Sequence, residues 1–531
     1  MRKAWRVQQA EAEDDDTAIL EWLSSRKRVA AFVFSENPYW LGYLGEALAR
    51  TLAGGVTEAD LYLWSLATPY TGLTGLHPNK LIKTAEDGFR ALGASGGSRA
   101  LSTQLAQISL GRLRIHERAQ LASPLPRPLS AAISAARTGP LRDAQYRGAA
   151  AGWAVEGTLA TVTCSSRAQE FTPVQDIHLM MKSYAAVFET ATIELTRTRP
   201  EAVLIFNGRL LHEWAVREAA TRLGLPIVVV EVGHTPELFS LHWQSAHDGN
   251  EYGRRVRHTW DTAAGLSQDQ AHILAHAWFE SRRTGGDGSN RFIRHQTLGT
   301  IPALANGRRR VVYYTSSSDE LLSAGSEWLS PIGSQEDILD QLIRLADQET
   351  CLQIIVRMHP HTLLKNTRDQ AWWREFMSNA ARHNVLVLGP ESPVDSYALA
   401  DSADLVLSTG STMGIEAAYW GRASATLAPA IYDSLGATKT VASMDEALDL
   451  RPDAGELAER RAKALPWGLY QATFGLEMRY FQPFPPTYPF GGRPLARRGR
   501  FQALVPEWVS RRRGDAEFAK RTGVRRASSI L

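Results

Sequence analysis

Short apolar runs alternate with amphipathic stretches along most of the chain. In the first half, residues 29–34, 61–64, 202–206 and 227–230 are apolar runs of strand length, whereas 176–196 and 213–223 carry apolar residues at helical spacing. A run that is apolar at every position predicts a strand buried on both faces. The alternation therefore predicts βαβ units, in which right-handed crossovers join parallel strands.

A second alternating series occupies the other half of the chain. The pattern predicts strands at 311–314, 353–357, 385–388 and 404–407, with helices near 334–348, 370–383 and 396–402. Between the two series, residues 284–310 contain "TGGDGSNR" and "ANGRRR", which are typical of a domain boundary. We therefore expect an α/β protein with two Rossmann-like domains and a ligand cleft that faces the carboxyl ends of the strands.

This interpretation divides the chain into four segments. Residues 1–300 form an N-terminal domain that includes helices and loops at 85–150, and residues 301–440 form the second domain. Residues 441–485 include a helical segment that we expect to pack back across both domains, and 486–531 form a basic tail. A length of 531 residues exceeds what one hydrophobic core usually supports, which agrees with two domains.

Composition narrows the class of protein. A hydrophobic content of 44% and a charged content of 22% are ordinary for a globular protein. Cys164 and Cys351 are far apart in the sequence, which argues against a zinc cluster or a disulfide framework and favours a reducing cytoplasm. The N-terminus lacks the apolar core of a signal peptide, and no uncharged apolar run has the length of a membrane-spanning helix.

Charge is unevenly distributed although the net charge is only +3. Residues 11–16 read EAEDDD, and residues 493–531 contain eleven Lys or Arg against three Asp or Glu. A solvated end is the simpler interpretation of such a tail. Peripheral contact with an anionic membrane is the alternative, and we expect no nucleic-acid partner.

Polar corners follow three predicted strands of the second half. They are "TSSSDE" at 315–320, "MHPHT" around His359, and "STGSTMGIEAAYWGR" at 408–422, in which Gly421 stands where a left-handed helix C-cap would. Helix caps, and a proline that ends a strand, are the ordinary explanation of each corner taken singly. Because the carboxyl ends of parallel strands meet at one edge of a sheet, the three together predict a nucleotide-type site.

The residue types suggest roles at that site. The hydroxyl and backbone N–H groups of Ser316, Ser317, Gly410, Ser411 and Thr412 suit a phosphate group. Glu416 would repel a phosphate at contact distance, so we expect it to reach ribose hydroxyls. His359 could donate to a leaving-group oxygen and Arg357 could add positive charge, although a single histidine before a proline is more often structural.

The first half has polar corners of its own. Asn207 and Arg209 follow the strand at 202–206, and Glu231 and His234 follow the strand at 227–230. Glu36 follows the first predicted strand. We expect Asn207, Arg209 and His234 to meet an acceptor, and Glu231 or Glu36 to remove a proton from its hydroxyl. Helix caps and surface polar residues are the competing interpretation.

These residues also carry a resemblance. The segments "YYTSSSDELLSAGSEW", "IVRMHPH", "GPESPVDSYALADSADLVLSTGSTMGIEAAYWGRAS" and "FNGRLLHEWAVREAATRLGLPIVVVEVG" resemble bacterial capsule and surface-polysaccharide biosynthesis proteins of the GT-B glycosyltransferase type, over roughly residues 200–435. The resemblance implies GT-B architecture, a nucleotide-sugar donor held mainly by the C-terminal domain, and a glycan or lipid-linked acceptor. It implies work in the cytoplasm or at the inner membrane. Such proteins often read Glu-Arg-Gly where this chain has Glu231-Val232-Gly233-His234, which puts any role of that arginine in doubt.

No metal or other cofactor is expected, because the nucleotide-sugar is a substrate and the only Asp-x-Asp lies at 14–16, ahead of the first strand. Three alternatives to a glycosyltransferase stay open at this point. They are a nucleotide-sugar epimerase, a transferase that moves a polyol phosphate from a CDP-linked donor, and a non-catalytic scaffold of polysaccharide assembly.

Overall fold

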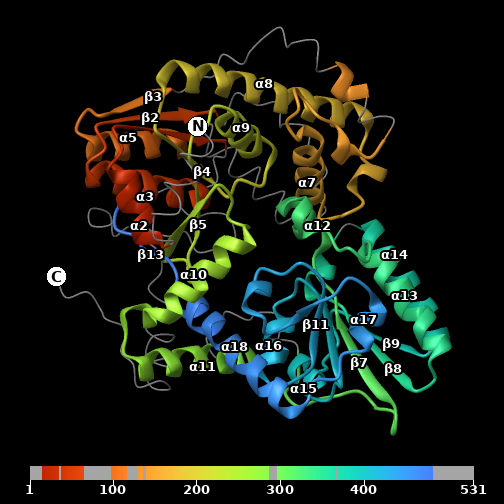
Figure 1. Cartoon of the computed structure of the whole chain (residues 1–531). Helices are drawn as coiled ribbons and strands as arrows, with labels where there is room; N and C mark the ends of the chain where they lie inside the picture. Colours follow the sequence, from red (N-terminus) through yellow and green to blue (C-terminus); the bar gives the residue numbers. More distant parts are fainter. Residues whose placement is uncertain are drawn as a thin grey trace. The chain divides into compact units, whose positions relative to one another are not determined.

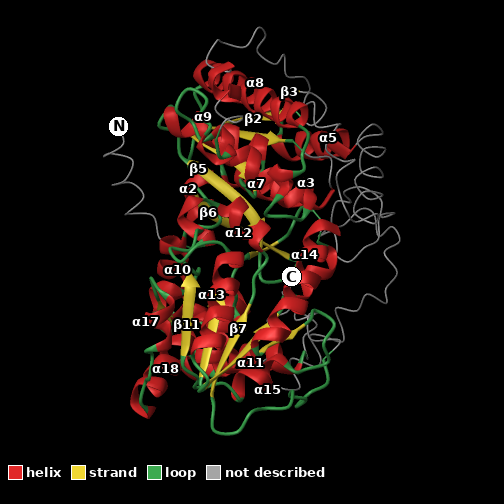
Figure 2. Ribbon diagram, turned by 90° about the vertical axis from the view of Figure 1, so that its right-hand side faces the viewer, coloured by secondary structure: helices red, strands yellow, loops and turns green. Residues whose placement is uncertain are grey.

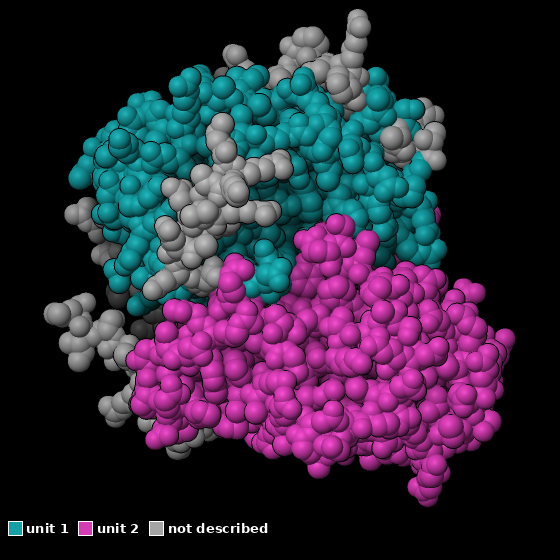
Figure 3. Space-filling model, viewed as in Figure 1, with its two compact units in different colours: residues 1–251, 322–324, 474–505 teal, residues 252–321, 325–473, 506–531 magenta. Residues whose placement is uncertain are grey.

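The computed structural model describes residues 15–34, 38–64, 97–116, 130–134, 139–285, 296–365 and 367–481. These residues form two compact units (Figure 3). Unit 1 contains the described residues of 1–251, 322–324 and 474–505, and unit 2 those of 252–321 and 325–473. Two expectations, a catalytic Glu36 and a basic tail at 486–531, lie outside the described residues.

Unit 1 is built on a mainly parallel sheet (Figure 1). Its described strands are β1 (Arg28–Val33), β2 (Glu58–Leu63), β3 (Leu113–His116), β4 (Ala202–Phe206), β5 (Ile227–Val232), β6 (Leu238–Trp243) and β13 (Leu476–Glu477). Their order is β13-β6-β5-β4-β1-β2-β3. The strands β1 to β5 are parallel, whereas β6 runs antiparallel to β5, and β13 runs antiparallel to β6.

Alternate residues of each strand enter opposite cores, as the pleat of a strand requires. In β1, Ala30 and Phe32 pack on one face, and Val29, Ala31 and Val33 pack on the other. The first face is covered by α7 (Ala151–Thr163), α8 (Val174–Thr198) and α9 (Leu211–Arg222). The second is covered by α2 (Asp16–Ser24), α3 (Pro38–Gly54) and α5 (Gly97–Ser109). Because both faces are covered, the central strand β4 is apolar and buried at every position.

Unit 2 contains a fully parallel sheet with helices on both sides (Figure 2). Its described strands are β7 (Arg309–Tyr314), β8 (Leu352–Arg357), β9 (Val385–Leu388), β10 (Leu405–Thr409), β11 (Ser424–Ala428) and β12 (Lys439–Thr440). Their order, β12-β11-β10-β7-β8-β9, is that of a Rossmann sheet. One mainly parallel and one fully parallel sheet confirm the predicted α/β class with two Rossmann-like domains.

Two helical layers enclose the sheet of unit 2. One face is covered by α13 (Gln335–Gln348), α14 (Thr367–Ala380) and α17 (Met444–Leu448). The other is covered by α15 (Ser396–Asp401) and α16 (Met413–Tyr419). The helix α11 (Gln268–Thr284) packs against α18 (Ala454–Thr473), and α18 also contacts α16. Two other helices are α10 (Gly249–Asp261) and α12 (Ser318–Ala324).

The two units divide between Glu251 and Tyr252, earlier than the boundary expected at 284–310. The reason is packing, since α11 lies against α18 and α16 of unit 2 although it precedes the Gly-rich segment. After α18 the chain returns to unit 1, where β13 pairs with β6. Within the described ranges, no helix combines the length and the apolarity that crossing a membrane requires.

Candidate functional site

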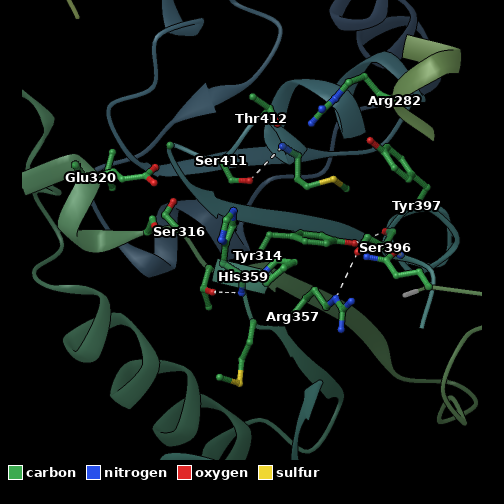
Figure 4. Close-up of a pocket in the computed structure, with 18 residues that line it drawn as sticks. Arg282, Tyr314, Ser316, Glu320, Arg357, His359, Ser396, Tyr397, Ser411 and Thr412 are labelled. Carbon is green, nitrogen blue, oxygen red and sulfur yellow. Dashed lines mark hydrogen bonds between the residues drawn. The ribbon is translucent and has the colours of Figure 1, made fainter. Parts of the chain in front are cut away.

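The carboxyl ends of three strands in unit 2 meet at one cavity. β7 lies between β8 and β10, and the three strands run in the same direction. The strand order reverses at β7, and open α/β sheets bind ligands at such a reversal. A cavity of ≈ 330 Å³ lies here, large enough for a small organic molecule (Figure 4). Its lining residues are Arg282, Gln296, Tyr314, Thr315, Ser316, Ser317, Glu320, Leu321, Arg357, Met358, His359, Pro360, Ser396, Tyr397, Gly410, Ser411, Thr412 and Met413.

All three predicted corners contribute to this lining. The residues expected there from the sequence that line the cavity are Ser316, Ser317, Arg357, His359, Gly410, Ser411 and Thr412. The lining also includes residues to which the sequence analysis gave no role, among them Arg282, Gln296, Ser396 and Tyr397. Ser396 and Tyr397 occupy the start of α15, so a search for polar helix starts at the same sheet edge would have included them.

His359 is separated from β8 by Met358 alone and caps the start of the 3₁₀ helix η7 (Pro360–Leu364). Its backbone N–H donates to Thr315 Oγ1 at 2.8 Å, and its Nδ1 accepts from the His361 N–H at 3.2 Å. Burial and the neighbouring His361 lower the pKa of His359 to about 4. The ring is therefore neutral at pH 7, and because Nδ1 accepts a hydrogen bond, its proton is on Nε2.

Arg357 lines the cavity, but its guanidinium is held by neighbouring protein groups. Its Nη1 donates to the Gly389 carbonyl at 2.8 Å, its Nη2 to the Ser392 carbonyl at 3.3 Å, and its Nε to Ser396 Oγ at 3.4 Å. The residue is 3% exposed, and burial lowers its pKa. Its contacts thus order the loop before α15. The positive charge that Arg357 is predicted to offer a ligand phosphate stays a prediction.

The hydroxyl groups that line the cavity differ in how strongly they bond to neighbouring protein groups. Ser316 Oγ donates to the Thr409 carbonyl, and Ser317 Oγ accepts from Lys365 Nζ at 3.0 Å. Ser411 Oγ accepts only weakly from the Met413 N–H at 3.3 Å, and the side chain of Thr412 does not cap α16. Gly410 adopts φ +73°, which lets the chain turn from β10 toward the helix. Ser411 and Thr412 are therefore the hydroxyls that best suit a ligand oxygen.

Glu416 takes a position that differs from the expectation. It is 1% exposed and is not among the residues that line the cavity. One carboxylate oxygen accepts from the Tyr397 hydroxyl, and the other lies 3.3 Å from Arg282 Nη2. Both partners line the cavity, so this structure connects Glu416 to the cavity through Tyr397 and Arg282. Glu416 itself does not line the cavity, and its predicted contact with ribose stays a prediction.

Unit 1 brings together three of its predicted residues at the ends of β4 and β5. Asn207 Nδ2 donates to Glu231 Oε1 at 2.5 Å, and Asn207 Oδ1 accepts from Arg209 Nε at 3.0 Å. Burial raises the pKa of Glu231, although the charge of Arg209 opposes this. Asn207 holds φ +62°, an uncommon conformation that recurs at functional sites. Asn207 thus orients a carboxyl group that is a plausible proton acceptor.

His234 is held elsewhere in unit 1. Its Nδ1 lies 2.6 Å from the Phe474 carbonyl, and its backbone N–H donates to the same oxygen at 3.1 Å. This arrangement attaches the turn after β5 to the segment that follows α18. The role of His234 toward an acceptor stays a prediction, and these contacts show that His234 also has a structural role.

A buried acid at the start of α9 is a second titratable group of unit 1. Glu213 is 6% exposed, and burial raises its pKa to about 7. The preceding His212 is buried, bonds to Ser183 Oγ at 2.9 Å, and has its pKa lowered by burial to about 3. No cluster of three His, Cys, Asp or Glu among the described residues is arranged to hold a metal ion.

Comparison with known proteins gives structural neighbours only. No family model and no curated protein sequence matches the chain. Among solved structures, KpsC of Thermosulfurimonas dismutans, a beta Kdo 2,4 transferase, is similar at 14% identity with a TM-score of 0.32, over 53% of this chain and 80% of that one. A UDP-GlcNAc 2-epimerase from Neisseria meningitidis bound to UDP-GlcNAc is similar at 10% identity with a TM-score of 0.22, over 84% and 97%. The glycotransferase of kitacinnamycin is similar at 12% identity with a TM-score of 0.24, over 85% and 96%. Values this low do not assign a reaction or a substrate to this chain.

Proposed function

We propose that this protein is a glycosyltransferase that moves a sugar from a nucleotide-sugar donor to a surface or capsular polysaccharide or a lipid-linked glycan. The observation that carries the proposal is the cavity at the β8-β7-β10 edge of unit 2. It combines the position at which Rossmann sheets bind nucleotides with hydroxyl groups, a neutral histidine and an arginine. These groups suit a phosphorylated donor.

Sugar transfer requires a hydrogen-bond donor at the atom on which negative charge develops. In sugar transfer, the acceptor oxygen forms a bond to the anomeric carbon while the bond from that carbon to the phosphate oxygen breaks. The electrons of the broken bond remain on the phosphate, which leaves with the nucleotide. The Nε2–H of a neutral His359 can donate a hydrogen bond to the developing charge without first gaining a proton, which supports a role in the transition state.

The proton of the acceptor hydroxyl needs a base. Glu231 is our candidate, because Asn207 holds its carboxylate and burial raises its pKa toward neutral pH. Arg209 lies on the other side of Asn207 and balances the charge of the carboxylate when it is ionised. Unit 1 would thus serve the acceptor and unit 2 the donor.

Incubation with a panel of nucleotide sugars, with and without an acceptor glycan, tests the proposal. We expect nucleotide release and an extended glycan, both dependent on the acceptor. An epimerised nucleotide sugar without a glycan product would replace the proposal with an epimerase. Release of CMP from a CDP-polyol would indicate a polyol-phosphate transferase. Binding without any product would indicate a scaffold.

Nucleotide binding can be measured before the sugar is known. A thermal-shift screen of CMP, CDP, UDP and GDP compares the bases directly, because a ligand at a hundred times its dissociation constant stabilises the folded state by about 2.7 kcal/mol. A chain that no nucleotide stabilises would contradict the assignment of the cavity.

A further inference from the structure

Three side chains from three helices meet beside the cavity of unit 2. Arg282 comes from α11, Tyr397 from α15 and Glu416 from α16. The Tyr397 hydroxyl donates to one oxygen of Glu416, and Arg282 Nη2 lies 3.3 Å from the other. Arg282 and Tyr397 line the cavity (Figure 4). Glu416 is 1% exposed.

The charges of the cavity lining distinguish Arg282 from the other basic groups. His359 is neutral at pH 7, because its pKa is lowered to about 4. Arg357 directs three donors to Gly389, Ser392 and Ser396, so its guanidinium is committed to the protein. The side chain of Arg282 is 17% exposed, and its partner Glu416 is a buried acid that is not among the lining residues. Among the described lining residues, Arg282 is therefore the cation best placed to serve an anionic ligand.

The buried carboxylate also explains how the arginine is held. A long flexible side chain loses rotamer entropy when a ligand fixes it. Because the ion pair with a buried acid already holds Arg282, part of that entropy is lost before a ligand binds. Tyr397 in turn fixes the carboxylate, and its own backbone N–H donates to Asp395 Oδ1 at 2.9 Å in the N-cap of α15. The position of Arg282 is thus set by the start of one helix and by a carboxyl group of another.

We propose that Arg282 binds the phosphate groups of the ligand in the unit 2 cavity and that Glu416, fixed by Tyr397, is the residue that positions it. The inference rests on the proposed function, because it takes the ligand to be a nucleoside diphosphate or its sugar ester. Arginine suits this role because its planar guanidinium can donate to the carboxylate and to a phosphate from different N–H groups. Glu416 then acts on the ligand without touching it.

The binding of inorganic pyrophosphate distinguishes a phosphate-binding role of this cluster from direct recognition of ribose. We would measure the binding of pyrophosphate, of UDP, CDP and GDP, and of the corresponding nucleosides by calorimetry. Arg282→Gln should weaken pyrophosphate and the nucleoside diphosphates by about 10- to 100-fold, as expected for the loss of one charged hydrogen bond, and should leave the nucleosides unchanged. Glu416→Gln should weaken pyrophosphate as well, because pyrophosphate has no ribose that Glu416 could contact.

The neighbouring Arg283 offers a matched control. It belongs to the same helix and pairs with Asp401, but it does not line the cavity, so Arg283→Gln makes the same change of charge without changing the site. We expect its affinities to equal those of the wild type. The double variant Arg282→Gln/Glu416→Gln keeps the buried site free of an unpaired charge, and it should bind pyrophosphate no more weakly than Arg282→Gln alone.

The outcomes are distinct. Wild-type affinity for pyrophosphate in Arg282→Gln would overturn the role of Arg282. Unchanged pyrophosphate binding in Glu416→Gln, with weaker nucleoside binding, would overturn the positioning role and return Glu416 to a ribose contact. In both cases the proposed function stands. A wild-type protein that binds neither pyrophosphate nor any of the diphosphates would overturn the inference and the proposed function together.

Discussion

Replacement of His359 with glutamine should change how the stability of the protein depends on pH. The pKa of His359 is lowered from 6.5 to about 4 in the folded state. In the unfolded chain the ring binds a proton near its ordinary pKa, so acid favours the unfolded state. Above pH 6.5 both states are neutral, and His359 contributes no pH dependence. Between pH 6.5 and about 4 the wild type therefore loses stability that the glutamine variant retains.

The size of the effect follows from the shift. Each unit of pKa is worth about 1.4 kcal/mol, so a shift from 6.5 to about 4 corresponds to about 3 kcal/mol over the whole window. His212 has its pKa lowered to about 3, but it is present in both proteins, and its contribution cancels in the comparison. Urea unfolding at several pH values between 7.5 and 4.5 measures the difference between the two curves.

The variant His359→Ala, whose side chain has no hydrogen-bond donor, tests the catalytic role. Loss of one hydrogen-bond donor at a developing charge typically lowers turnover by about 10² to 10³. We expect that loss in kcat, with a smaller change in donor affinity. If the two stability curves run parallel, the ring is not held neutral by the fold. If the folded variant keeps near-normal turnover, His359 belongs to the structure of the η7 turn and not to the reaction.

Three further predictions concern other parts of the chain. Glu231→Gln should lower turnover by about 10²-fold or more and remove the acid limb of the pH–rate profile. We expect that limb above the ordinary carboxyl pKa, because burial raises the pKa of Glu231, and an unchanged profile would exclude Glu231 as the base. Glu46→Gln should cost about 3 kcal/mol in urea unfolding, because the buried carboxylate accepts three backbone N–H groups of residues 479–481 within 2.8 Å, and a loss below 1 kcal/mol would contradict this account. Gly414→Ala should cost about 1–3 kcal/mol, because its Cβ would lie 2.5 Å from Tyr432 Oη, and a melting temperature equal to that of the wild type would show that the site relaxes.

Local pattern was enough to predict most strands and their direction. The run 202–206 is apolar at every position because both faces of β4 are covered, and β9 was predicted with its observed bounds, 385–388. The three polar corners also followed from local pattern, because the end of a parallel strand is where polar residues are tolerated. Gly421 was expected to be left-handed after the helix, and its φ of +75° confirms this.

Some short strands at the edges of the sheets were not predicted from the sequence. β3 is partly exposed and mixes basic and apolar residues, so residues 85–150 gave no strand signal. β6 and β13 add antiparallel edges to an otherwise parallel sheet, and their pairing joins residues 238–239 to 476–477. Local periodicity reports which face of an element is buried. It carries no information on the partner that buries it.

Only the tertiary structure decided the chemistry within the cavity. The sequence placed Arg357 and Glu416 at the correct sheet edge, but the guanidinium of Arg357 turns to loop carbonyls, and Glu416 lies buried behind the lining. Arg282 reaches the same place from α11, 134 residues before its partner Glu416. The direction of a side chain depends on which donors, acceptors and charges surround it after folding. Those neighbours are set by packing between distant segments, and a pattern of hydrophobic and polar positions along the chain does not specify them.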